Sequence, residues 1–158
     1  MKNIDSYTHT RGESIYVDDI PILGGTLFAV VFDAPVAHGK ITILDVSHAQ
    51  NMPGVKQIIT HKDIPGENQI GGIFPDEPAL ANGEVHFRGQ PVALILATSE
   101  KLGRAARDKI IFEAEELPVI VDPRVAAAKG FIIGPVRTFE MGNAQNEWKN
   151  CLHIYEGI

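Results

Sequence analysis

Histidines are the residues of this chain best suited by type to bind a metal or to transfer protons near neutral pH. None of them forms an i, i+4 pair on a predicted helix, and none stands beside a second ligand at metal spacing. This spacing favours surface or hydrogen-bonded structural roles over metal ligation by roughly ten to one. The six are His9, His38, His48, His61, His86 and His153.

Paired carboxylates and paired glycines offer other chemistry, but their settings do not favour it. Asp18-Asp19 and Glu115-Glu116 are sequence neighbours, which point to opposite faces of an extended chain and cannot share a substrate as acid and base. Gly24-Gly25 and Gly71-Gly72 open no predicted helix that could receive a phosphate. We expect turn-forming or solvated roles for all four pairs.

No nucleophile can be nominated. The serines lack a G-x-S-x-G context, and Cys151, the single cysteine, has no recognisable base beside it. One cysteine forms no intrachain disulfide and cannot by itself hold zinc or an iron–sulfur centre. The expectation is a reduced, intracellular protein.

The most suggestive stretch is a long connection over residues 61–85, rich in glycine and proline. It carries an apolar pair, Ile73 and Phe74, beside two acids, Asp76 and Glu77. Such a loop could be a ligand-facing flap. It could equally be a hydrophobic plug that pins the loop to its own sheet. The residues alone weigh these two interpretations equally.

The surrounding elements predict an α+β fold with a mixed sheet and one main helix packed on it. The helix begins after its cap, Ser99, and runs to about Asp108. A short second helix starts at Asp122-Pro123 and ends at Gly130. We predict one domain over residues 1–130 and an irregular tail over 131–158, with a last strand at 152–155. Strands are predicted over 26–32, 40–46, 55–60, 90–97 (the centre of the sheet) and 109–114.

Composition excludes several classes of function. The 158 residues suit one ordinary domain, with 44% hydrophobic and 22% charged residues. A net charge of -6 gives no attraction for a nucleic-acid backbone. No apolar run approaches the roughly 20 residues that span a bilayer, and the first residues do not resemble a signal peptide. The expected location is the cytoplasm.

A series of short motifs resembles, in order, the start of the molybdenum-binding region of the xanthine dehydrogenase and aldehyde oxidase family. The opening segment 12–21 (GESIYVDDIP) is similar to the family pattern G-E-A-x-Y-x-D-D-I-P. Order strengthens each short match. The further segments that carry the resemblance are 37–41 (AHGKI), 53–55 (PGV), 62–68 (KDIPGEN), 72–77 (GIFPDE), 84–91 (EVHFRGQP), 105–106 (AA) and 116–118 (ELP).

The resemblance implies the α/β hammerhead domain, which in this family packs against a larger molybdopterin-binding domain. Those proteins hydroxylate purines or aldehydes, take the oxygen from water, and pass electrons through 2Fe-2S clusters to FAD on partner domains or subunits. The family's pterin-binding glycine-rich segments, catalytic glutamate and substrate-orienting arginine follow the equivalent of residues 155–157. The resemblance therefore implies a non-catalytic fragment, expected to bind no cofactor or metal and to be inactive alone.

The same resemblance places Ile73 and Phe74 at positions that line the substrate channel of a heterocyclic or aldehyde substrate. It leaves open whether the parent is a xanthine dehydrogenase, another purine hydroxylase or an aldehyde oxidase. A rival hypothesis is a free-standing module that binds a protein or small ligand through the 61–85 loop. An unshielded docking face also predicts self-association, and thus a homo-oligomer.

Overall fold

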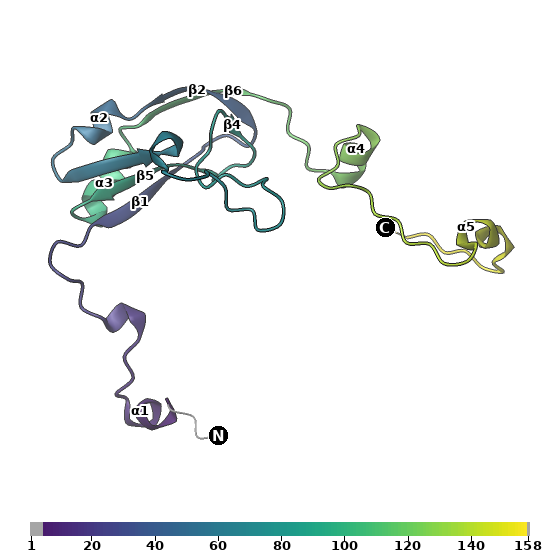
Figure 1. Ribbon diagram of the computed structural model, residues 1–158, viewed down its shortest axis with the longest axis horizontal. Coiled ribbons are helices and arrows are strands. Elements are labelled where there is room, and N and C mark those ends of the chain that lie inside the picture. The colour runs from purple at the N-terminus through teal and green to yellow at the C-terminus, as the bar shows by residue number, and fades with distance from the viewer. Residues whose placement is uncertain (1–4, 158) are drawn as a thin grey trace. The chain divides into compact units, whose positions relative to one another are not determined.

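The computed structural model describes residues 5–157, and its backbone contacts divide the chain into two units. The first unit runs to Val119 and the second begins at Ile120. All six strands in this described part of the chain belong to the first unit (Figure 1). The predicted boundary at residue 130 lies just after a short helix, α4 (Pro123–Ala128), whereas the contacts divide the chain before this helix.

One sheet is built around the most apolar strand of the chain. β5 (Pro91–Ala97) lies between β1 (Phe28–Asp33) and β3 (Val55–Thr60), and both pairs are antiparallel. Most of its side chains are buried, because a strand flanks it on each side and a helix packs on it. The prediction that this segment forms the centre of a sheet is confirmed.

A second antiparallel sheet has the order β4-β2-β6. β2 (Gly39–Asp45) pairs with β4 (Glu84–Val85) on one side and β6 (Ile111–Glu116) on the other. A β-carbon at Gly39 would come 2.9 Å from the carbonyl oxygen of Glu115, so glycine allows β2 and β6 to approach here. β6 begins two residues later than predicted.

The main helix, α3 (Glu100–Arg107), packs on β1 and β5. The Ser99 hydroxyl accepts a hydrogen bond from the Leu102 N–H at 3.3 Å, which confirms the predicted cap. Gly103 faces the sheet, where a β-carbon would lie 2.6 Å from Val30 Cγ2. The predicted α+β class, with one main helix packed on the sheet, is thus confirmed.

The core has two parts, joined through Phe32, which packs against both. β5 contributes to each part, because successive side chains of a strand point to opposite faces. The larger cluster holds Val30, Ala49, Ile58, Ala93, Ile95 and Ala106, and the smaller holds Ala34, Ala81, Val85 and Val92.

Short helices complete the first unit. They are α1 (Ser6–Arg11), η1 (Val17–Asp19), α2 (Ser47–Gln50) and η2 (His61–Asp63). The Asp19 carboxylate closes η1 by accepting a hydrogen bond from the Tyr16 N–H at 2.9 Å, so the expected turn-forming role holds for this residue.

The described residues of the second unit, 120–157, form only short helices: α4 (Pro123–Ala128), α5 (Ala144–Glu147) and η3 (Trp148–Asn150). Asp122 caps α4 by accepting from the Arg124 N–H at 2.7 Å, as predicted. The predicted strand at 152–155 is wrong, because this segment pairs with no other strand among the described residues. Across residues 5–157, no helix combines the length and apolar character needed to cross a bilayer.

Candidate functional site

The loop over residues 64–83 connects η2 to β4 and is ordered by its own side chains. Asn68 ties the two ends of the loop together: its Nδ2 donates to the Leu80 carbonyl at 2.7 Å, and its Oδ1 accepts from the Leu80 N–H at 2.9 Å. Leu80 and Ala81 are buried, and the Ala81 N–H donates to the Pro91 carbonyl at 2.7 Å. The base of the loop is therefore fixed to the sheet.

A second amide shapes the tip of the loop. Gln69 Oε1 accepts hydrogen bonds from the Gly71 N–H at 2.8 Å and the Glu77 N–H at 2.9 Å. A β-carbon at Gly71 would overlap the carbonyl oxygen of Phe74, so only glycine fits. The paired glycines 71 and 72 thus form part of a turn, as expected, and this turn presents residues 72–76.

The apolar pair of this tip is exposed. Ile73 is 89% accessible and Phe74 is 53% accessible. Since neither side chain is buried against the sheet, the plug interpretation is wrong. What remains is an exposed apolar tip on a loop that hydrogen bonds hold at its base, and only a binding partner or ligand would cover this tip.

The fold also brings together two histidines and a glutamate that are separated in the sequence. His38 Nε2 lies 3.0 Å from Glu84 Oε1, and His86 Nδ1 lies 3.8 Å from the same oxygen. One ligand atom from each residue falls within 4.8 Å of the others, and no other such trio occurs in the described part of the chain. No spacing in the sequence indicated this trio, because strand pairing brings His38 to Glu84 and His86 only in the folded sheet.

Hydrogen bonds set the electrostatics of this trio. The Pro118 carbonyl, which accepts from His38 Nδ1 at 3.0 Å, and then the Glu84 carboxylate raise the pKa of His38. The hydrogen bond from His38 in turn lowers the pKa of Glu84. These shifts favour a protonated His38 beside an ionised Glu84, which together form an ion pair. Because both side chains are partly exposed, solvent limits the strength of this ion pair.

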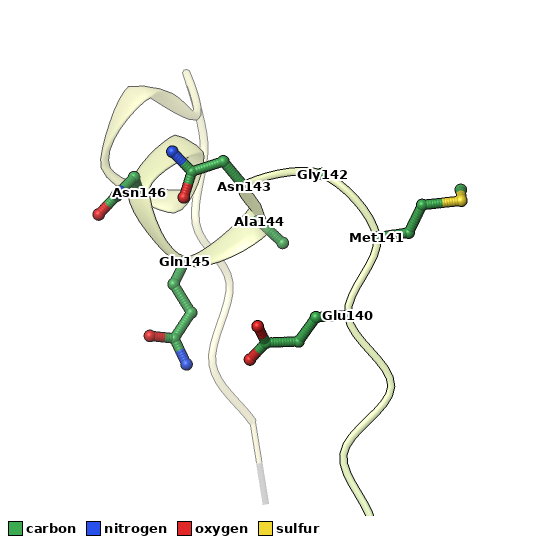
Figure 2. Close-up of a pocket in the computed structure, with 7 residues that line it drawn as sticks. All are labelled: Glu140, Met141, Gly142, Asn143, Ala144, Gln145 and Asn146. Atoms are coloured by element: carbon green, nitrogen blue, oxygen red, sulfur yellow. The ribbon is translucent and has the colours of Figure 1, made fainter.

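A small hollow in the second unit is a weaker candidate for a binding site. Seven consecutive residues, 140–146, line it, and Figure 2 shows Glu140 turned toward its concave side and Met141 away from it. All of these residues are exposed. A ligand in this hollow would therefore meet a single turn of chain.

Comparison with protein families finds one match over residues 11–118. The matching model describes the aldehyde oxidase and xanthine dehydrogenase a/b hammerhead domain. Aldehyde oxidase 1 of Bos taurus is 34% identical over 159 residues, which is 99% of this chain and 12% of that protein. Xanthine dehydrogenase of Drosophila pseudoobscura pseudoobscura is 37% identical over 149 residues, which is 92% of this chain and 11% of that protein.

Solved structures of aldehyde oxidoreductases share this fold, which confirms the predicted hammerhead class. The aldehyde oxidoreductase of Desulfovibrio gigas aligns with a TM-score of 0.70 and 36% identity over 82% of this chain and 15% of that one. The enzyme from Desulfovibrio desulfuricans ATCC 27774 aligns with a TM-score of 0.71 and 31% identity, covering 16% of its chain. The chain therefore spans only a small part of each protein that it resembles.

Proposed function

Because the chain belongs to the aldehyde oxidase and xanthine dehydrogenase family, as its α/β hammerhead domain, we propose that it is the non-catalytic hammerhead part of a molybdenum hydroxylase. The complete enzyme would hydroxylate purines or aldehydes with oxygen from water. The match over residues 11–118 carries this proposal. In this enzyme the chain would have two tasks: it would dock against a partner domain, and it would form part of the wall of the substrate channel.

Exposed apolar side chains support the docking task. In the second unit the described residues include no buried side chain, yet several of its large apolar residues are almost fully accessible. A segment that buries nothing has little to offset the entropy of ordering it. A molybdopterin-binding domain would supply the missing cover. The most exposed of these residues are Val121, Ile133, Phe139, Leu152 and Tyr155.

The loop tip supports the second task. Ile73 and Phe74 would form an apolar wall of the substrate channel in the assembled enzyme. Such a wall removes water from a planar heterocycle or an aldehyde and narrows its approach, without forming bonds to it. Asn68 and Gln69 would hold this wall in place through the hydrogen bonds that they make to the loop backbone.

The residues present do not fit the molybdopterin group itself. A pterin with its phosphate tail needs several polar groups directed into an enclosed site. Among the described residues, Gln90 is the only buried polar side chain, and its Oε1 already accepts a hydrogen bond from the His86 N–H at 2.7 Å. We therefore assign the cofactor, and the 2Fe-2S and FAD groups that would follow it, to partner domains or subunits.

The test is reconstitution. The chain is produced together with the molybdopterin-binding polypeptide and the iron–sulfur and FAD components, and a parallel sample omits the chain. Bound molybdenum and substrate-dependent dye reduction are then measured with xanthine and with an aldehyde. We expect activity only when the chain is present.

Equal activity without the chain would contradict the proposal. A stable, monomeric chain that never joins the molybdenum-containing complex would instead favour the interaction module. A preference between xanthine and the aldehyde would distinguish a purine hydroxylase from an aldehyde oxidase.

A further inference from the structure

The register of two strands sets the positions of His38, Glu84 and His86. Gly39 pairs with Val85 in the antiparallel β2–β4 ladder, so His38 falls opposite His86. Val85 is fully buried, and its two neighbours in the chain therefore point to the outer face. The two histidine rings stack with centroids 6.3 Å apart.

The tautomer of His38 leaves one nitrogen facing a carboxylate. Its Nδ1 lies 3.0 Å from the Pro118 carbonyl, which only accepts hydrogen bonds, so Nδ1 must carry a proton. In neutral His38, Nε2 would then present a lone pair to Glu84 Oε1, only 3.0 Å away. Two acceptors at this distance repel each other unless a cation lies between them. That cation is either a proton or a metal ion.

Several features favour a metal ion as well as a proton. A histidine that binds metal through one ring nitrogen usually donates its other N–H to a backbone carbonyl or carboxylate, as His38 does to Pro118. Ligand atoms in a tetrahedral zinc site lie about 3.3 Å apart, given metal–ligand distances of about 2.0–2.2 Å. The distances of 3.0 and 3.8 Å to Glu84 Oε1 bracket this value.

We infer that His38, Glu84 and His86 form a binding site for one Zn²⁺-class divalent cation, with two imidazole ligands and one carboxylate. Two histidines and a glutamate are a ligand set that zinc accepts, with the fourth position open to water. The trio is partly exposed, so an ion can reach it without unfolding. This site is independent of the proposed function of the domain.

A bound ion would connect three parts of the second sheet. His38 precedes β2, Glu84 begins β4 at the end of the 64–83 loop, and Pro118 follows β6. β4 has only two residues and makes few ladder bonds, so it has the most to gain from a cross-link. Zinc should therefore stabilise the folded chain and protect this edge of the sheet.

The test is zinc binding by the metal-stripped full chain. Zn²⁺ is titrated in competition with a chromophoric chelator, and Co²⁺ is added separately to detect the visible absorption of a four-coordinate site. We expect one ion per chain and a higher melting temperature with zinc. His38→Ala and His86→Ala should each weaken binding by at least about tenfold.

Two variants keep this test decisive. His86 makes only the longer, 3.8 Å contact and is 56% exposed, so His86→Ala should fold even if His38→Ala does not. His48→Ala, at an exposed histidine outside the trio, should leave zinc binding unchanged. No zinc binding by the unaltered chain, or equal affinity in His86→Ala and His48→Ala, would overturn the site and leave His38 and Glu84 as a simple ion pair.

Discussion

The side-chain amide of Asn68 hydrogen-bonds both backbone groups of Leu80, as a neighbouring strand would. It donates to the Leu80 carbonyl at 2.7 Å and accepts from the Leu80 N–H at 2.9 Å. These two bonds cross the neck of the 64–83 loop, twelve residues apart in the chain. Leu80 is buried, so water cannot readily replace these two hydrogen bonds.

Asn68→Ala should therefore loosen the loop. Leaving both backbone groups of Leu80 without their partner is expected to cost about 1–3 kcal/mol of folding stability. Hydrogen exchange of the amides in residues 70–80 should become faster. Asn82→Ala, at an exposed position beyond the loop neck, is the matched control. Equal exchange in the two variants would show that Asn68 does not hold the loop.

Phe74→Ala tests the proposed channel wall. The side chain is already 53% exposed in this chain, so its removal should change the free energy of unfolding by less than about 0.5 kcal/mol. In the assembled enzyme we expect kcat/KM to fall about tenfold, the effect of losing an apolar contact in a substrate pocket. Phe87→Ala, at a similarly exposed phenylalanine, should leave kcat/KM near its original value.

Substitutions at the centre of the first sheet should lower the folding stability of the chain more than substitutions elsewhere. Ile95 is fully buried between β1, β3 and α3, and Ile95→Ala is expected to cost about 2–5 kcal/mol in urea unfolding. Val31→Ala, at an exposed position of β1, should cost less than about 1 kcal/mol. Similar urea midpoints for Ile95→Ala and Val31→Ala would contradict the placement of Ile95 in the core.

Acid should weaken the turn that opens the 64–83 loop. The Thr60 N–H and hydroxyl both donate to Asp63 Oδ2 at 2.8 Å, and they lower the pKa of Asp63 below its ordinary value of 3.8. A lowered pKa gives stability that is present above pH 3.8 and is lost as the pH falls through the folded-state pKa.

The expected result is a stability difference between the original chain and Asp63→Asn that is largest near pH 6 and shrinks below pH 3.8. Urea unfolding across this range measures it. Asp18→Asn, at an exposed acid in η1, is the comparison variant. A difference that stays constant down to the lowest pH would exclude the carboxylate as its cause.

The sequence predicted the elements that neighbouring residues stabilise, such as a capped helix, and those that consist almost entirely of apolar residues. Ser99 predicted the start of α3 through its side-chain cap, and the apolar run over residues 90–97 predicted a central strand. The predicted start of β6 was early because Lys109 and Ile110 donate to the Ala106 and Arg107 carbonyls, which extends the end of the helix. The apolar residues at 152–155 suggested a strand, but a strand also needs a partner.

The histidine–glutamate trio could not be predicted in the same way. His38 and Glu84 are 46 positions apart, and only the β2–β4 register brings them together. The one local signal was the alternation of Glu84 and His86 around buried Val85, which puts both on one face of a strand. Likewise, the sequence could not distinguish a plug from an exposed tip at Ile73, because the distinction depends on how Gln69 turns the loop.

The strand order of the first sheet also governs when it can form during synthesis. β1 and β3 do not pair with each other, and each finds its ladder only in β5, which ends at Ala97. A nascent chain that extends only as far as the end of β3 therefore has two strands without their ladder partner. Contacts so distant in sequence slow folding and expose unpaired edges meanwhile. Until β5 has been synthesised, the backbone edges of β1 and β3 stay open to pairing with other chains.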